Sequence, residues 1–342
     1  MLPRWLDSTN NIKSMGLNNK TILVTGGSGS FGMKFTEIVL RYYKPKVIRI
    51  FSNNEFEQFQ MQQKFKEDKR LRYFIGDVRD KDRVYRAMNG ADIVVHAAAL
   101  KEVPACEYNP FEAVKTNIIG SQNVIDAAID NDVEKVINLS TDKAVNPVNL
   151  YGASKLCAEK LFIQANSYVG TRKTKFSCTR YGNVMGSRGS VVPLFLEQKR
   201  RGILTITDKR MTRFWITLEE GVHFVINCIR LMKGGEIFIP KIPSLRIINL
   251  AKVIAPKAKI KITGIRPGEK IHEILLSTEE ARHSKEFDRY FVVEPEFPFW
   301  RRKNLKGGKA LPEGFKYTSG TNKKWLTKKQ IRKMLKKIEI EE

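Results

Sequence analysis

The sequence predicts an α/β protein with a doubly wound parallel sheet and a smaller, mixed C-terminal lobe. In the first half of the 342 residues, short apolar runs alternate with longer segments of helical spacing. Such alternation is typical of a parallel sheet covered by helices. The apolar runs contain few alternating polar residues, which indicates strands that are buried on both faces.

The expected strands and helices follow one another regularly up to about residue 183. We expect strands at 21–25, 47–51, 73–75, 93–96, 136–139 and 176–181, and helices at 31–43, 55–66, 81–88, 111–131 and 151–168. Beyond this point glycines and prolines separate shorter elements, and a basic helix is expected at 325–340. A chain of this length holds about two domains, so we divide it into residues 1–183 and 184–342.

Composition excludes several classes of protein. Hydrophobic residues make up 42% and charged residues 28%, which is typical of a globular protein. No apolar run is long enough for a membrane helix, and residues 1–20 lack the apolar segment of a secretory signal. The four cysteines have no paired spacing and lie at Cys106, Cys157, Cys178 and Cys228. They indicate reduced cytoplasmic thiols, with neither a disulfide framework nor a metal site.

The net charge of +25 is the unusual feature of the composition. Such a charge suits a nucleic-acid binder or an enzyme that acts on anionic substrates. Residues 301–342 contain 14 Lys and Arg against four acidic residues, and the remaining excess is spread along the chain. Since no basic stripe is interleaved with aromatic residues, we expect a generally basic surface and neither a nucleic-acid nor a membrane partner.

A glycine-rich turn follows the first expected strand and opens the first expected helix. Residues 25–32 spell TGGSGSFG. Residues without a Cβ atom let the backbone approach a pyrophosphate, whose charge then lies at the helix N-terminus. With a strand before it and a helix after it, the motif indicates a Rossmann-like dinucleotide-binding turn. The expected cofactor contacts in the turn are Gly26, Ser28, Gly29, Ser30, Phe31 and Gly32.

The end of the second strand should select the cofactor. An acid there holds the ribose 2′-hydroxyl of NAD, whereas a polar or basic residue accommodates the 2′-phosphate of NADP. The segment contains Ser52, Asn53, Asn54 and Glu55, with no acid directly at the strand end and no cation. This favours NADP and leaves NAD open. Further cofactor contacts are expected from Asp77 and Val78 at the adenine edge, and from the small residues Ala97 and Ala99.

Candidate catalytic residues follow the fifth expected strand, where open α/β sheets place their sites. Thr141, Asp142 and Lys143 come directly after that strand. Tyr151 and Lys155 lie four residues apart, on one face of the next helix. An ammonium group near a phenol lowers the phenol pKa, so the phenolate can accept a hydroxyl proton during hydride transfer. Both residues are also expected to contact the cofactor.

Taken together, these motifs resemble the extended short-chain dehydrogenase/reductase superfamily. Longer strings resemble one branch of it, the inverting UDP-N-acetylglucosamine 4,6-dehydratases that commit UDP-GlcNAc to pseudaminic acid. The strings lie at 98–104, 139–155, 180–190, 210–217 and 264–270, so the resemblance covers nearly the whole chain. The sequence departs from the branch after the second strand, where members often carry Ser-Arg-Asp-Glu and this chain has Ser-Asn-Asn-Glu.

The resemblance implies a reaction with internal hydride transfer. NADP takes a hydride from C4 of the sugar while Tyr151 removes the 4-hydroxyl proton. Lys143 then abstracts H5, Asp142 protonates the departing 6-hydroxyl, and the hydride returns to C6. In these roles Lys143 requires a lowered pKa and Asp142 a raised one. The resemblance links the Asp-Lys pair to inversion at C5, because retaining relatives carry Asp-Glu.

The resemblance also implies the remaining assignments. Residues 1–183 would form the NADP-binding domain, and residues 184–342 would mainly bind substrate and end in a basic tail. The substrate contacts would be Lys101, Thr141, Asn183, Arg266 and Glu269. The product would be UDP-2-acetamido-2,6-dideoxy-β-L-arabino-hex-4-ulose, which makes the protein a hydro-lyase. We expect a cytoplasmic homo-oligomer, a dimer or a hexamer, at the first step towards pseudaminic acid or a related sugar. A retaining UDP-sugar 4,6-dehydratase or a UDP-sugar 4-epimerase is the alternative.

Overall fold

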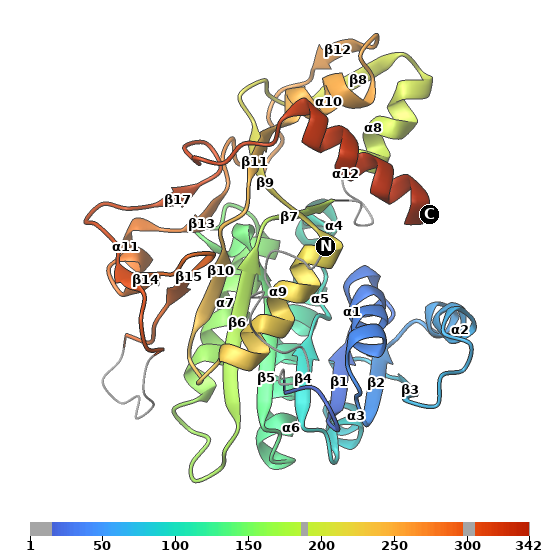
Figure 1. Cartoon of the computed structure of the whole chain (residues 1–342), viewed down its shortest axis with the longest axis vertical. Helices are drawn as coiled ribbons and strands as arrows, with labels where there is room; N and C mark the ends of the chain where they lie inside the picture. Colours follow the sequence, from blue (N-terminus) through green and yellow to red (C-terminus); the bar gives the residue numbers. More distant parts are fainter. Residues whose placement is uncertain (1–15, 186–190, 297–304, 342) are drawn as a thin grey trace.

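A ten-stranded sheet forms the centre of the protein in the computed structural model, which describes residues 16–185, 191–296 and 305–341 (Figure 1). Across the sheet the strands are β16 (Lys309–Ala310), β14 (Ser284–Glu286), β15 (Tyr290–Val293), β10 (Ile237–Pro240), β6 (Lys175–Tyr181), β5 (Lys135–Thr141), β4 (Ile93–His96), β1 (Thr21–Thr25), β2 (Val47–Ser52) and β3 (Leu71–Ile75). The pairs from β10 to β3 are parallel, whereas β14, β15 and β16 pair antiparallel. The α/β fold class predicted from the sequence is confirmed.

Helices flank the main sheet. They are α1 (Ser30–Tyr42), α2 (Glu55–Lys64), α3 (Lys81–Met88), α6 (Gly120–Asp130), α7 (Leu150–Ala165) and α9 (Leu218–Leu231). Helix α1 packs against α9, while α3 and α7 pack against α6. Strands β1 and β4 are buried along their whole length, as their uninterrupted apolar sequences predict.

Residues 111–131 do not form the single regular helix that the sequence predicts. The segment contains α5 (Pro110–Val114), a π-helical turn η2 (Lys115–Ile119) and then α6, and a further helix α4 (Val103–Tyr108) precedes it. The buried Asn117 lies in the π-helical turn. Its side chain accepts a hydrogen bond from the backbone N–H of Leu100 (2.8 Å) and donates to the Leu100 carbonyl (2.9 Å) and to Ser154 Oγ (2.9 Å). The wide turn thus binds the loop after β4 to α7.

A second lobe has its own sheets and its own apolar core. It contains β7 (Asn183–Met185), α8 (Val191–Arg200), β8 (Ile203–Ile206), β9 (Thr212–Thr217), β11 (Ser244–Arg246), α10 (Ile247–Ile254), β12 (Lys259–Ile262) and α12 (Lys328–Glu341). Strands β11, β9 and β7 form one sheet and β12 with β8 another. The core includes Trp215, Phe195 and Leu250. Helix α12 is the basic helix expected near the C-terminus, beginning at Lys328.

The chain returns from the second lobe to the main sheet. Helix α9 and strands β10, β14, β15 and β16 all come from residues beyond 183. Segments on both sides of residue 183 therefore build the main sheet (Figure 1). Three short elements complete this part: β13 (Ile274–Leu276), α11 (Thr278–Ala281) and β17 (Tyr317–Thr318). Residues 186–190, which end the string at 180–190, lie outside the described residues. So do residues 1–15, where no secretory signal is expected.

A buried arginine attaches α7 to the C-terminal segment. Arg180 on β6 is fully buried, and its Nη2 lies 2.6 Å from Glu159 Oε2 and 2.8 Å from Glu280 Oε1. Its Nη1 donates to the Leu275 carbonyl at 3.0 Å. A buried cation with two carboxylate partners is costly to disturb, because removing it leaves the partners uncompensated.

Replacing Arg180 with Met is expected to lower the free energy of unfolding by about 3–5 kcal/mol, because it leaves the buried Glu159 unpaired. The measurement is urea denaturation followed by circular dichroism. Arg201→Met is the matched control, since Arg201 pairs with Glu197 where both side chains are exposed. The control should change stability by less than about 1 kcal/mol. Equal stability of the two variants would contradict the anchoring role of Arg180.

Candidate active site

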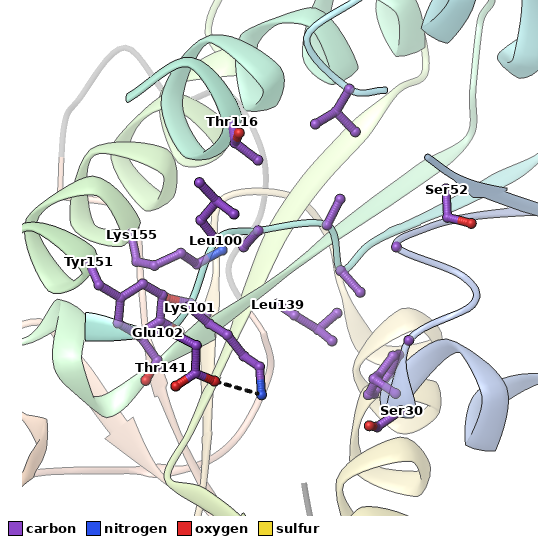
Figure 2. A pocket seen from close by; sticks show the side chains of 18 of the residues that line it. Ser30, Ser52, Leu100, Lys101, Glu102, Thr116, Leu139, Thr141, Tyr151 and Lys155 are labelled. Carbon is purple, nitrogen blue, oxygen red and sulfur yellow. Dashed lines mark ion pairs between the residues drawn. The ribbon is translucent and has the colours of Figure 1, made fainter. Parts of the chain in front are cut away.

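A cavity of about 800 Å³ opens where the parallel strands end. Its lining comes from the residues that follow β1, β2, β3, β4, β5 and β6, the edge at which open α/β sheets bind ligands. In Figure 2, Ser30 and Ser52 lie at one side of the cavity, and Thr141, Tyr151 and Lys155 at the other. The volume is typical of a pocket for a cofactor or a small molecule.

The structure brings most of the predicted site residues to this cavity. The lining includes Gly26, Ser28, Gly29, Ser30, Phe31, Ser52, Asn53, Asp77, Val78, Ala97, Ala99, Lys101, Thr141, Lys143, Tyr151, Lys155 and Asn183. Gly32, Asn54, Glu55, Asp142, Arg266 and Glu269 are not among the lining residues. Asn54 instead caps α2, accepting a hydrogen bond from the Glu57 backbone N–H at 3.0 Å. Arg266 is exposed and Glu269 half-buried in one turn, and their contact with a substrate stays a prediction.

The glycine-rich turn has the shape of a phosphate cradle. Gly26 has φ +63°, and a Cβ atom on it would lie 2.9 Å from the Ala98 backbone nitrogen. A Cβ atom on Gly32 would collide with the backbone of Gly27. The N-cap of α1 is Gly29, which offers no side chain to cap the first turn. The backbone N–H groups at this helix end are thus suited to hold an anion such as a pyrophosphate.

A cation that sequence reasoning missed lies near the end of β2, beside Asn53 and Asp77. Arg79 lines the cavity, and its Nη2 lies 2.7 Å from Asp77 Oδ2. Asn53 donates to the same carboxylate oxygen at 3.2 Å. Burial alone would raise the pKa of Asp77, but the hydrogen bonds from Arg79 outweigh it and lower that pKa. Arg79 follows β3 and not β2, so a search at the end of the second strand could not find it.

Asp142 and Lys143 form a hydrogen-bonded pair. Both lie in a 3₁₀ turn, η3 (Asp142–Ala144), directly after β5. Lys143 Nζ is 3.0 Å from Asp142 Oδ1, which also accepts a hydrogen bond from Thr141 Oγ1 at 3.1 Å. Asp142 is fully buried, and its Oδ2 has no hydrogen-bond partner among the described residues. The Lys143 side chain is 24% exposed and reaches the cavity.

One member of this pair, Asp142, has the pKa shift that was expected, and the other, Lys143, does not. Burial raises the pKa of Asp142, as its expected role as an acid requires. Burial would lower the pKa of Lys143, but the charges of Asp142 and Glu273 outweigh it and raise that pKa. The lowered pKa expected for Lys143 is therefore wrong in this geometry. The physical reason is that two carboxylates face the one ammonium group.

Tyr151 and Lys155 project from the first turns of α7 towards the cavity (Figure 2). Asn149 caps this helix by accepting a hydrogen bond from the Gly152 backbone N–H at 2.7 Å. Burial raises the pKa of Tyr151 to about 12, opposed first by the charge of Lys143 and then by a hydrogen bond with Thr141. Burial lowers the pKa of Lys155 to about 8. The expectation that the phenol pKa is lowered is wrong here, because burial of the ring outweighs the neighbouring charge.

Two of the expected substrate contacts lie beside this group. Lys101 is half-exposed, with its Nζ 3.6 Å from Glu102 Oε1, on the loop that Asn117 holds (Figure 2). The side-chain oxygen of Asn183 is buried and has no hydrogen-bond partner in the described parts of the chain. A polar atom of this kind on a cavity wall indicates a contact that a ligand completes.

Sequence reasoning did not identify the groups behind Lys143. Glu273 Oε1 lies 3.6 Å from Lys143 Nζ and 3.5 Å from Arg213 Nε. The available signal was the pair His272-Glu273, which follows the string at 264–270 after one further residue. Nothing in the order of residues places it beside Lys143, 130 positions earlier. Within residues 16–185, 191–296 and 305–341 no cluster of three or more His, Cys, Asp or Glu side chains could hold a metal, and no helix could cross a membrane.

Known proteins resemble this chain over most of its length. Residues 22–295 match the family described as polysaccharide biosynthesis protein. A UDP-N-acetylglucosamine 4,6-dehydratase (inverting) of Campylobacter jejuni subsp. jejuni strain 81-176 is 52% identical over 323 residues, which is 92% of this chain and 96% of the relative. A UDP-glucose 4-epimerase of Rickettsia akari is 41% identical, over 93% of this chain and 95% of the relative. The X-ray structure of Pen from Bacillus thuringiensis has a TM-score of 0.87 and 40% identity, and the match covers 95% and 99% of the two chains.

Gly32→Ala is expected to weaken binding of a nicotinamide dinucleotide by at least about tenfold, because the added methyl group must displace the backbone of Gly27 in the cradle. Isothermal titration calorimetry gives the measurement. Gly221→Ala is the matched control, since a Cβ atom at Gly221 in α9 would meet no atom within 4 Å. Unchanged affinity in Gly32→Ala would show that the turn is not the dinucleotide site.

Proposed function

The chain belongs to the polysaccharide biosynthesis protein family of extended short-chain dehydrogenases/reductases, and we propose that it is an inverting UDP-N-acetylglucosamine 4,6-dehydratase. The observation that carries the proposal is the Asp142–Lys143 pair, with 3.0 Å between Lys143 Nζ and Asp142 Oδ1, at the cavity that Tyr151 also lines. A dehydratase needs a base for H5 and an acid for the 6-hydroxyl. The pair supplies both groups from adjacent positions.

The glycine-rich turn and the residues after β2, β3 and β4 would hold a nicotinamide dinucleotide along the sheet edge. When bound, this cofactor supplies hydride acceptance from C4 of the sugar and hydride return to C6. The guanidinium of Arg79 at the adenosine end of the cavity suits the 2′-phosphate of NADP. The carboxylate of Asp77 beside it suits the 2′-hydroxyl of NAD, so NAD stays open.

The chain's own residues would move the protons. Tyr151 must first lose its own phenol proton. As the phenolate it then takes the proton of the 4-hydroxyl as C4 is oxidised. Transfer of one proton from Lys143 Nζ to Asp142 Oδ1, across their hydrogen bond, then leaves a neutral amine and a protonated carboxyl. The amine abstracts H5, and the carboxyl gives its proton to the departing 6-hydroxyl, which leaves as water. After hydride return to C6, C5 would take a proton from solvent on its opposite face, which inverts that centre. The raised pKa of the buried Asp142 supports this division of roles.

A UDP-sugar 4-epimerase or a retaining dehydratase is the second candidate. The Rickettsia akari relative, named as an epimerase, supports it. Inversion at C4 alone uses Tyr151 and the dinucleotide but gives no task to Asp142 and Lys143, so the pair favours dehydration. The hydro-lyase class follows from the proposed reaction. The homo-oligomer, the cytoplasmic location, the domain roles and the route towards pseudaminic acid stay predictions from the resemblance.

Incubation of the purified protein with UDP-GlcNAc in D₂O is expected to give a 4-keto-6-deoxy sugar of L-arabino configuration. Deuterium should enter at C5, because that proton comes from solvent, while C6 should receive the hydrogen of the substrate's own C4. Reduced cofactor should not accumulate. NMR at early times measures the product. A D-xylo product would assign the protein to the retaining branch, and UDP-GalNAc without deuterium would make it an epimerase.

Lys143→Ala and Tyr151→Phe should stop the reaction at different steps. Each loss of a general base is expected to cost about 10²–10⁴ in rate. Lys143→Ala should still oxidise C4 and so show a lasting absorbance of reduced nicotinamide, whereas Tyr151→Phe should show none. Lys241→Ala is the control, since Lys241 pairs with Glu286 outside the cavity. If Lys143→Ala kept more than about a tenth of the wild-type rate, the role of Lys143 would be wrong.

A further inference from the structure

One oxygen atom behind the proposed catalytic pair lies between two cations. Glu273 is 2% exposed, and its Oε1 lies 3.6 Å from Lys143 Nζ and 3.5 Å from Arg213 Nε. Its Oε2 is buried without a hydrogen-bond partner among the described residues. Glu273 comes from the segment before β13 and Arg213 from β9 in the second lobe. A carboxylate and a guanidinium from distant parts of the chain therefore meet behind Lys143.

Hydrogen bonds that do not involve Lys143 hold the backbone of Glu273 and the side chain of Arg213. The Glu273 N–H donates to Ser319 Oγ at 2.9 Å, and the Ser319 N–H donates to the Glu273 carbonyl at 2.8 Å. Arg213 Nη1 donates to the carbonyls of Thr212 (2.8 Å) and Ile271 (3.2 Å). Because each residue is fixed independently of Lys143, the two charges act on its ammonium group from set positions.

We propose that Glu273 and Arg213 are positioning residues that set, in opposite directions, how readily Lys143 gives up its proton. The inference rests on the proposed function, in which Lys143 must become a neutral amine. The charge of Glu273 stabilises the ammonium form. Arg213 forms an ion pair with the same carboxylate oxygen and repels the ammonium group, so it weakens that stabilisation. Glu273 and Arg213 together thus keep Lys143 charged before the reaction begins, and they still allow it to give up its proton.

The charges around Lys143 support this balance. The titratable and charged groups that face it are Asp142 in η3, Tyr151 in α7, Arg213 in β9, and Lys270 and Glu273 in the segment before β13. Burial would raise the pKa of Glu273, but Lys143 and Arg213 outweigh burial and lower it, so this carboxylate stays ionised. The proton that leaves Lys143 therefore goes to Asp142, whose pKa is raised by burial.

The pH dependence of kcat/KM for UDP-GlcNAc tests the proposal. In the active form the Asp142–Lys143 pair holds one titratable proton. Activity therefore falls at low pH, where the pair gains a second proton, and at high pH, where it loses the one it holds. Removing the negative charge in Glu273→Gln lowers the pKa values of the pair, and both limbs should move to lower pH by about one unit. Removing the positive charge in Arg213→Gln should move both limbs to higher pH. The double variant should lie between them, and Arg213→Lys should restore the wild-type profile.

Matched controls remove one charge outside the cavity. Glu286→Gln and Arg201→Gln break ion pairs with Lys241 and Glu197, and both should leave the profile unmoved. Melting curves by circular dichroism identify folded variants. If Arg213→Gln does not fold, Glu273→Gln and Arg213→Lys still decide the question. Slower turnover with unmoved limbs in Glu273→Gln, or shifts of the same sign in both charge-removing variants, would overturn the proposal.

A second measurement separates this inference from the proposed function. If wild-type protein makes no keto sugar from UDP-GlcNAc, the proposed function is wrong. The pH dependence of Lys143 acetylation by acetic anhydride, read by peptide mass spectrometry, still reports the amine, which is 24% exposed. Its half-point should fall in Glu273→Gln and rise in Arg213→Gln. Equal half-points in all three proteins would overturn the inference whatever the reaction is.

Discussion

The parallel direction of the strands from β3 to β10 is the constraint on which the site depends. Parallel strands end at one edge of a sheet, so residues that are far apart in the sequence meet there. Gly26, Ser52, Asp77, Ala97 and Thr141 each follow or finish a different strand and all line one cavity. The sheet gives these groups a fixed order along the edge, with the glycine-rich turn at β1 and the Asp142–Lys143 pair at β5.

The electrostatic character of the site depends on the second lobe as well. Arg213 and Glu273 come from residues beyond 183, yet Arg213 contacts Glu273, and Glu273 contacts Lys143 at the end of β5. Arg180 adds a second connection, because it pairs with Glu159 on α7 and with Glu280 on α11. The helix that carries Tyr151 and the charges behind Lys143 are therefore held by the same C-terminal segment. The second lobe and the main sheet are thus joined by ion pairs at the end of β5 and along α7.

Local patterns in the sequence predicted the main sheet and the cavity well, because apolar runs and the glycine turn depend on near neighbours. The six expected strands are present, and the glycine turn and the Tyr151–Lys155 pair reach the cavity. Two kinds of feature could not be found this way. Glu273 raises the pKa of Lys143 across 130 residues, and β10 rejoins the main sheet after the second lobe. Both depend on packing between distant segments, which no spacing rule encodes.

The π-helical turn at Lys115–Ile119 also restricts how this sequence can change by deletion. A turn of this kind holds one residue more than a regular helical turn. Losing that residue would rotate everything after it by about 100°, and the buried face of α6 would turn out of the core. Gly120 now faces Val78, where even a Cβ atom would come within 2.7 Å of the valine side chain. A deletion here would therefore move Gly120 and the other buried residues of α6 out of register with the groups they pack against.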